Sequence, residues 1–273
     1  IGSVHLSLFT GVELKIDDVD ICERVRIPRV RASPEVGSLF GEKKVFSRLT
    51  LDGAVLKQAM LGDLLFGSMK GDGLRVGKLR FTDLQIEGDL GLPKLAGEVG
   101  FGDGGRISSI ALSGGGEAKV TGQMQTQGGA TDFEINAESA TIPFLPGLNL
   151  SNFGMKGTAN LQEVSVTQFS GKAFEGILSG NARIRWSGGW SVAGEVSAKQ
   201  MNAAVFAPTL ISEGRLEGTG RFSLSGADPA KLGPNGRLEG RFNVSKGAIG
   251  SVDLSRTLQS PNAPVAGGRT SFS

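Results

Sequence analysis

The sequence predicts a mainly β protein, an elongated antiparallel sheet with one or two short helices. Three observations support this fold class. Apolar residues recur at every second position, glycine-rich turn signals separate the alternating runs, and few segments have helical periodicity. Glycine supplies 43 of the 273 residues, roughly twice its usual share.

Strict alternation gives a sheet one apolar face and one solvated face, which is typical of antiparallel rather than buried parallel sheets. Phe222 and Leu224, for example, are two positions apart and are expected on one side of their strand, while Arg221 and Ser223 are expected on the other side. Because a twisted sheet with one dry face must curl around that face or cover it, we expect the apolar residues to lie on one continuous concave surface. The residues expected to line it are Leu14, Ile16, Phe81, Phe133, Ile135, Ile184, Trp186, Val196, Phe222, Leu224, Phe242 and Val244.

Helical spacing is best between Gly53 and Phe66, where Asp52 could cap the first turn, and a shorter helix is expected between Asn202 and Ile211. We divide the chain into residues 1–90, which contain the longer helix, and a glycine-rich segment, 91–273. Both are expected to belong to one continuous sheet. The sequence Gly-Arg-Leu-Glu-Gly occurs at 214–218 and again at 236–240, which fits one hairpin per unit stacked along an elongated sheet.

The composition excludes several classes of function. With one cysteine, Cys22, and one histidine, His5, the chain can supply neither a disulfide nor the four Cys or His ligands of a structural zinc site. Neither residue has the partners that a catalytic site requires, so we expect no catalytic residue, no metal, no cofactor and no enzymatic activity. The net charge of +2 is too small to indicate nucleic-acid binding.

Three local motifs have two interpretations each. Residues 100–105 match Gly-x-Gly-x-x-Gly, a dinucleotide-binding pattern, but strand-like residues follow where a helix is needed, so a hairpin loop is favoured. The arginines at 24, 26, 29 and 31 form either the solvated side of one strand or a contact for anionic headgroups or an acidic partner. Trp186 and Trp190 either pair across a hairpin tip or anchor it at a membrane interface.

Both ends of the chain resemble a known family. Residues 236–258 end in Gly-Ala-Ile-Gly-Ser-Val-Asp-Leu-Ser-Arg-Thr-Leu, and Gly-Gly-Arg-Thr-Ser-Phe follows at 267–272. Near the start, Gly-Val-Glu-Leu-Lys-Ile-Asp-Asp-Val at 11–19 leads into Arg-Val-Arg-Ala-Ser-Pro at 29–34. The first stretch resembles the C-terminal region of AsmA-family proteins of Gram-negative envelopes, a family with bridge-like lipid-transfer members, and the second is similar in style.

The resemblance implies a periplasmic protein whose sheet curls into a groove with an apolar interior. Its expected partners are phospholipid acyl chains, the inner membrane, and outer-membrane or other envelope proteins. Its expected role is phospholipid transport between the two membranes or outer-membrane homeostasis. The family's N-terminal membrane helix does not occur in the sequence, so we expect the chain to be a fragment or a processed form, with the inner-membrane anchor elsewhere.

The apolar face has two interpretations. It can be an ordinary core, covered by a second sheet or a helix, or an open groove that holds acyl chains. The scarcity of helix and the many strands with apolar parity favour the groove. The alternative function is a structural or secreted β-solenoid or adhesin-like module that transports no lipid.

Overall fold

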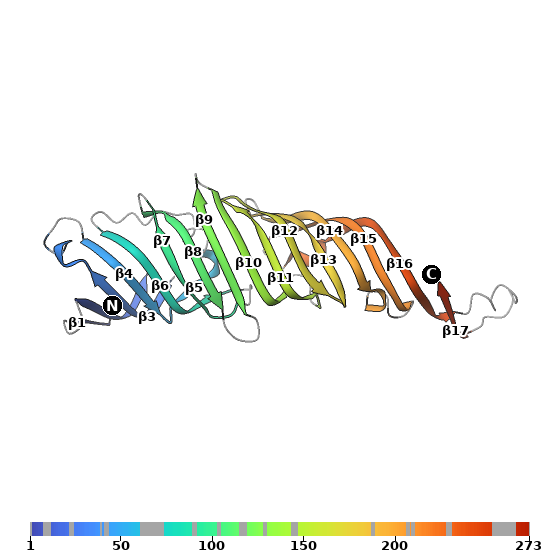
Figure 1. Ribbon diagram of the computed structural model, residues 1–273, viewed down its shortest axis with the longest axis horizontal. Coiled ribbons are helices and arrows are strands. Elements are labelled where there is room, and N and C mark those ends of the chain that lie inside the picture. Colours follow the sequence, from blue (N-terminus) through green and yellow to red (C-terminus); the bar gives the residue numbers. More distant parts are fainter. Residues whose placement is uncertain are drawn as a thin grey trace.

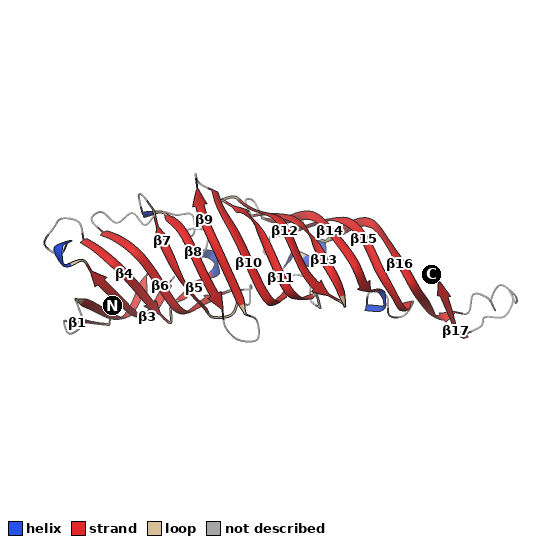
Figure 2. Cartoon of the chain, in the orientation of Figure 1, coloured by secondary structure: helices blue, strands red, loops and turns tan. Residues whose placement is uncertain are grey.

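A computed structural model describes residues 2–7, 12–21, 25–38, 40, 44–60, 74–88, 92–102, 105–114, 119–127, 130–142, 147–186, 189–205, 208, 211–227, 231–252 and 266–272. These residues form one long, curled sheet of seventeen strands, and helix is limited to short 3₁₀ turns (Figure 2). The predicted fold class, a mainly β half-pipe of antiparallel strands, is confirmed.

The strands are β1 Ser3–Ser7, β2 Glu13–Ile21, β3 Val25–Pro34, β4 Lys44–Asp52, β5 Val55–Lys57, β6 Leu74–Glu87, β7 Leu95–Phe101, β8 Ile107–Gly114, β9 Val120–Gln127, β10 Ala130–Thr141, β11 Asn149–Ala159, β12 Glu163–Ala173, β13 Gly176–Arg185, β14 Trp190–Asn202, β15 Ile211–Gly226, β16 Arg237–Val252 and β17 Ala266–Phe272. The 3₁₀ turns include η1 Val36–Ser38, η2 Gln58–Met60, η4 Ala203–Val205 and η6 Gly233–Asn235.

The strands follow one another along the long axis, from β1 near the N-terminus to β17 near the C-terminus (Figure 1). From β6 onward each strand pairs antiparallel with the next strand in the chain. The exception to this meander lies in the N-terminal part, where β4 and β5 lie end to end between β3 and β6 and run parallel to β6. The pairing of β6 with β7 makes residues 1–90 and 91–273 parts of the same sheet.

The helix expected between Gly53 and Phe66 is wrong wherever the structure describes this segment. Gly53 has a φ of 71°, and Val55–Lys57 is strand β5, paired on both sides, before the short η2 turn. Backbone pairing with β3 and β6 therefore overrides the helical spacing; residues 61–66 lie outside the described residues. The helix expected between Asn202 and Ile211 is also wrong wherever the structure describes this segment, because β14 ends at Asn202, η4 is a single turn, and β15 begins at Ile211; residues 206, 207, 209 and 210 lie outside the described residues.

A line of backbone kinks runs along the sheet. Asp18, Gly53, Asp83, Asn152 and Gln200 have φ values between 49° and 71°, in the left-handed region that Gly, Asn and Asp tolerate best. Bulges in the strand pairing accompany the last three. A bulge bends its strand and strengthens the local twist, so the kinks fold the sheet along its length.

Each kink keeps two apolar residues on the same face, although they are three positions apart. The left-handed residue lies two positions after the first and one before the second. The pairs are Ile16 and Val19, Leu51 and Ala54, Phe81 and Leu84, Leu150 and Phe153, and Ala198 and Met201. Both members of each pair pack in the same apolar cluster.

Candidate functional site

The candidate site is the apolar face of the sheet, which two rows of cross-strand neighbours cover from one end to the other. Residues opposite each other in adjacent strands point to the same side. We call these the inner rows, and the first contains only apolar residues and glycine. It runs through Val4, Ile16, Val30, Leu51, Phe81, Gly97, Leu112, Gly122, Ile135, Met155, Phe169, Gly180, Val196, Gly220 and Gly240.

The second inner row lies beside the first and has the same character. It runs through Leu14, Ala32, Leu49, Leu79, Val99, Ile110, Met124, Phe133, Gly157, Val166, Ala182, Gly194, Phe222 and Leu238. Neither row contains a charged or polar side chain. A strip two side chains wide therefore crosses the sheet from β2 to β16 without interruption.

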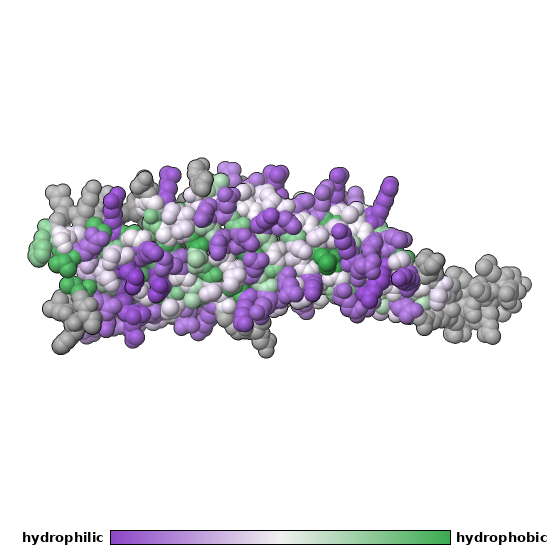
Figure 3. Space-filling model, in the orientation of Figure 1, coloured by the Kyte–Doolittle hydropathy of each residue, from purple (hydrophilic) through white to green (hydrophobic). Residues whose placement is uncertain are grey.

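The opposite, outer face is polar along the corresponding line. Between the inner rows, the outward-pointing neighbours are Lys15, Arg31, Thr50, Arg80, Glu98, Ala111, Gln123, Glu134 and Lys156. Figure 3 shows hydrophilic side chains along both long edges and scattered among neutral and apolar ones on the face turned to the viewer. The two faces thus differ in polarity along the same strands.

Strand pairing places eleven of the twelve sequence-predicted lining residues on this one apolar face. Seven of them belong to the inner rows: Leu14, Ile16, Phe81, Phe133, Ile135, Val196 and Phe222. Ile184 and Leu224 flank Val192 in a third, shorter row. Phe242 and Val244 lie opposite Gly218 and Leu216.

Trp186 is the one predicted lining residue that lies outside a strand. It directly follows the last residue of β13, and its ring centroid lies 5.9 Å from that of Trp190. Trp190 in turn packs against a cluster formed by Val192, Leu224 and Leu232. The pair therefore lies beside the third row, on the side of the β13–β14 hairpin tip.

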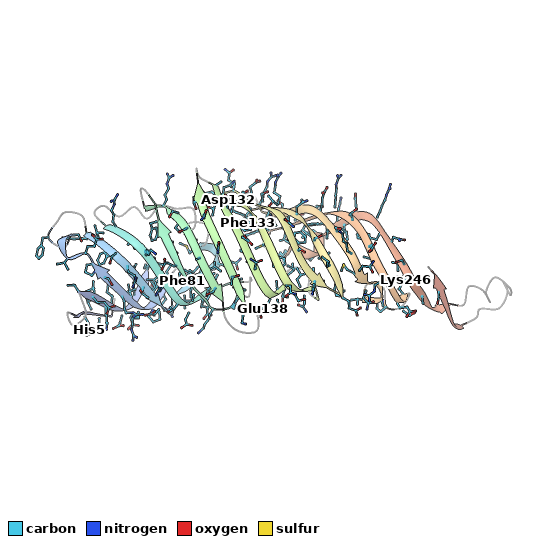
Figure 4. The ribbon with its side chains drawn as sticks, viewed as in Figure 1. His5, Phe81, Asp132, Phe133, Glu138 and Lys246 are labelled. Atoms are coloured by element: carbon cyan, nitrogen blue, oxygen red, sulfur yellow. The ribbon has the colours of Figure 1, made fainter. Side chains whose placement is uncertain are left out.

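Several inner side chains are buried although the sheet is a single layer. Phe81 exposes 6% and Phe133 exposes 8% of its surface. A flat sheet without a covering layer would leave such side chains open to water. Their burial means that the sheet curls toward this face, so that side chains from neighbouring strands cover one another. Phe133 lies with Asp132 near one end of β10, and Glu138 lies near the other (Figure 4).

Glycine allows this curvature. A Cβ at Gly157, Gly180 or Gly194 would collide with a backbone carbonyl oxygen of the adjacent strand, at Ser165, Glu195 and Asn181 respectively. Crowding of this kind on the inner face is expected where strands coil toward that face, and only a residue without a side chain fits. The inner-row glycines therefore mark the concave side.

Glycine also leaves space for the phenylalanine rings of the adjacent strands. Five inner phenylalanines lie directly opposite a glycine: Phe81 and Gly97, Phe133 and Gly157, Phe169 and Gly180, Phe222 and Gly194, and Phe242 and Gly218. At Gly97 and Gly180 the ring Cζ of the opposite phenylalanine lies 2.7 and 2.9 Å from the place that a Cβ would take. Those rings lie across the sheet instead of standing upright, which keeps the inner surface low and apolar.

One short segment covers part of the inner face. Leu232, in the connection between β15 and β16, is 1% exposed and packs against Val192 and Leu224. Asn235 ties the same connection to β15, because its Nδ2 donates to the Ser225 carbonyl oxygen at 3.1 Å. The half-pipe is therefore narrowed at this point.

Ion pairs cross the outer face from strand to strand. Arg31 approaches Asp52 at 3.0 Å, and Arg29 approaches Asp17 at 3.3 Å, so two members of the arginine run have acidic partners. Lys78 Nζ donates to Glu98 Oε1 at 2.8 Å, and this hydrogen bond lowers the pKa of the Glu98 carboxyl. Exposed pairs of this kind contribute little to stability, but they hold a charged layer on the side that faces water.

One residue of the glycine-rich motif, Phe101, packs against the apolar cluster of the inner face that contains Phe81 and Val99. The Gly-x-Gly-x-x-Gly segment connects β7 to β8, and the Gly102 amide donates to the Arg106 carbonyl oxygen at 2.9 Å. No helix follows it, so the arrangement is a hairpin loop. His5 is exposed on the outer parity of β1, opposite Lys15, and Cys22 lies outside the described residues.

Within the part of the chain that the structure describes, no three acidic, histidine or cysteine side chains gather as metal ligands. A search of the same residues finds no helix that is long and apolar enough to span a membrane. Comparisons with protein-family models, curated proteins and solved structures match nothing.

Proposed function

We propose that the inner face is a groove for the acyl chains of phospholipids, and that the protein moves lipid along this groove without catalysis. The observation that carries the proposal is the pair of uninterrupted inner rows. A charged side chain on the path would add a desolvation cost of several kcal/mol. The rows contain none between β2 and β16, while the outer face is charged.

The energetic need for such a path is large. Exposing an acyl chain to water costs about 0.8 kcal/mol per CH₂, or about 12 kcal/mol for a chain of roughly sixteen carbons. Strands in a sheet lie roughly 4.8 Å apart, so the first inner row, with fourteen successive spacings from β1 to β16, is roughly 65 Å long. A headgroup can remain in water at the open side while the acyl chains follow the strip.

The resemblance of both chain ends to the AsmA family supports the same proposal and adds a location. We place the protein in the periplasm of a Gram-negative envelope, held at the inner membrane by a segment outside this sequence. Its proposed partners are phospholipids, the inner membrane, and proteins of the outer membrane or envelope. Its proposed role is lipid transport between the membranes or outer-membrane homeostasis.

A second candidate function is a structural β module that binds no lipid. The deep burial of Phe81, Phe133 and Leu224 favours it, because these side chains are already shielded by their neighbours. Under this alternative the inner face is simply the core of a one-layer sheet. The two functions differ in whether the apolar strip accepts a ligand.

Analysis of co-purifying lipids distinguishes the lipid groove from the structural module. The chain is purified without detergent from a Gram-negative host, and its organic extract is examined by mass spectrometry. We expect phospholipids to co-purify and to be chemically intact, because the groove binds acyl chains and carries out no reaction. A chain that is folded by circular dichroism and free of lipid would support the structural module instead.

A further inference from the structure

One edge of the sheet is left open near the C-terminus. Strand β16 runs from Arg237 to Val252, and its β15 side is paired along most of this length. On its other side, β17 pairs only with the residues from Gly247 to Val252. Among the described residues, nothing pairs with the edge of β16 that faces away from β15 between Arg237 and Lys246. We call this segment the open edge.

The inner face is also uncovered along the open edge. Leu238 is 58% exposed and Phe242 is 42% exposed, while inner residues farther from the edge, such as Phe81 and Leu224, are less than 10% exposed. A long edge strand with exposed apolar residues is a template for pairing with another strand. Leu238 and Phe242 would gain cover from any strand added there.

The open edge is complementary to itself. On the outer face it carries Arg237, Glu239 and Arg241, all exposed and without an ion pair in the described part of the chain. If two copies pair antiparallel about Gly240, Glu239 of each lies opposite Arg241 of the other. On the inner face of the same arrangement, Leu238 of each copy lies opposite Phe242 of the other.

Like-charge contacts disfavour the registers centred on Glu239 and on Arg241. Pairing about Glu239 would place Arg237 opposite Arg241 and the two copies of Glu239 opposite each other, and like charges across a strand pair are destabilising. Pairing about Arg241 would place the two copies of Arg241 together. Pairing about Leu238 would leave Phe242 opposite Pro234, which lies in the η6 turn and not in a strand.

We propose that two copies of this chain associate through their open edges, from Arg237 to Asn243, in an antiparallel pairing centred on Gly240. Because cross-strand neighbours share a face, the inner rows of the two copies then join. The product is a two-fold symmetric half-pipe of twice the length, with both β1 strands at its far ends. The contact is small compared with standard interfaces of roughly 1,200–2,000 Å², so the dimer is weak and depends on concentration.

Sedimentation equilibrium of the intact chain tests the proposal. Across roughly a hundredfold range of concentration, we expect a shift from monomer to dimer and no larger species. Arg241→Glu places two glutamates opposite each other on both sides of the central Gly240 and should weaken dimerisation by at least tenfold. Combining Glu239→Arg with Arg241→Glu restores both opposite-charge pairs and should restore the dimer.

Lys156→Glu is the matched control, since it makes the same change in net charge on the outer face of an interior strand. It should dimerise as the unmodified chain does, and circular dichroism checks the fold of every variant. A photo-crosslinking residue in place of Phe242 should attach to Leu238 of the second copy. A chain that stays monomeric, a dimer that Arg241→Glu leaves intact, or a growing series of oligomers would each overturn the proposal.

Discussion

Phe222→Asp is expected to lower the rate at which the protein transfers phospholipid between vesicles by roughly tenfold or more, because a carboxylate in the groove adds a desolvation cost of several kcal/mol to the path. Phe222 lies in the second inner row, opposite Gly194 on one side and Leu238 on the other. The measurement is transfer of fluorescent phospholipid from donor to acceptor vesicles. Every lipid that passes along the strip must cross this position.

Two variants isolate the effect of the charge. Ser223→Asp introduces the same carboxylate one residue along the strand, on the outer face, and should leave transfer near that of the unmodified chain. Phe222→Ala removes the ring without adding charge and should cost less than Phe222→Asp. Equal loss in Phe222→Asp and Ser223→Asp, with both variants folded, would contradict a path along the inner face.

Gly180→Ala is expected to destabilise the fold by about 2 kcal/mol or more, which for a chain of this size lowers Tm by roughly 4–8 °C. The added methyl group would collide with the Glu195 carbonyl oxygen, and the Phe169 ring lies 2.9 Å from the same point. Relief requires the two strands to move apart, which flattens the curl locally. Thermal unfolding followed by circular dichroism measures the change.

Gly37→Ala provides the control, because nothing lies within 4 Å of the place that its Cβ would take. Its Tm should change by no more than about 2 °C, as expected of a surface substitution worth roughly 0.5 kcal/mol or less. Gly194→Ala should behave as Gly180→Ala does, since its Cβ meets the Asn181 carbonyl oxygen. Similar Tm values for all three variants would mean that inner-row glycines are not needed for the curvature.

Alternation in the sequence was sufficient to predict the fold class and the inward face of most strands. Leu14, Phe133 and Phe222 were assigned to the apolar face from their own strands alone, and the structure places all three in one row. The reason is physical: the side chains of a strand alternate with a period of two, so parity within one strand fixes the face wherever the backbone stays regular.

The alternation of apolar and polar residues could not predict the kinks, because a residue in the left-handed region interrupts the two-residue repeat of the strand. Phe81 and Leu84 are three positions apart, yet both point inward, since Asp83 between them has a φ of 52°. The available signal was an apolar pair three residues apart with Asp, Asn or Gly directly before its second member. The segments Ile-Asp-Asp-Val at 16–19, Phe-Thr-Asp-Leu at 81–84 and Leu-Ser-Asn-Phe at 150–153 all carry it.

The glycine partners of the inner phenylalanines were also beyond prediction from single strands. Gly97 and Phe81 lie in different strands, and only the register of β6 with β7 brings them together. The same limit explains the error at Val55–Lys57, whose pairing with β3 and β6 outweighs its local helical spacing. Features set by register between strands need the three-dimensional structure.

Photo-crosslinking on the two faces of the sheet tests the central claim, that acyl chains occupy the inner face, most directly. A photoreactive amino acid is placed at Phe133 and Phe222 on the inner face, and at Glu134 and Ser223 on the outer face, in cells with labelled phospholipid. We expect lipid adducts at Phe133 and Phe222 and hardly any at Glu134 or Ser223. Equal labelling of both faces, or none on either, would contradict a lipid groove and favour a structural sheet.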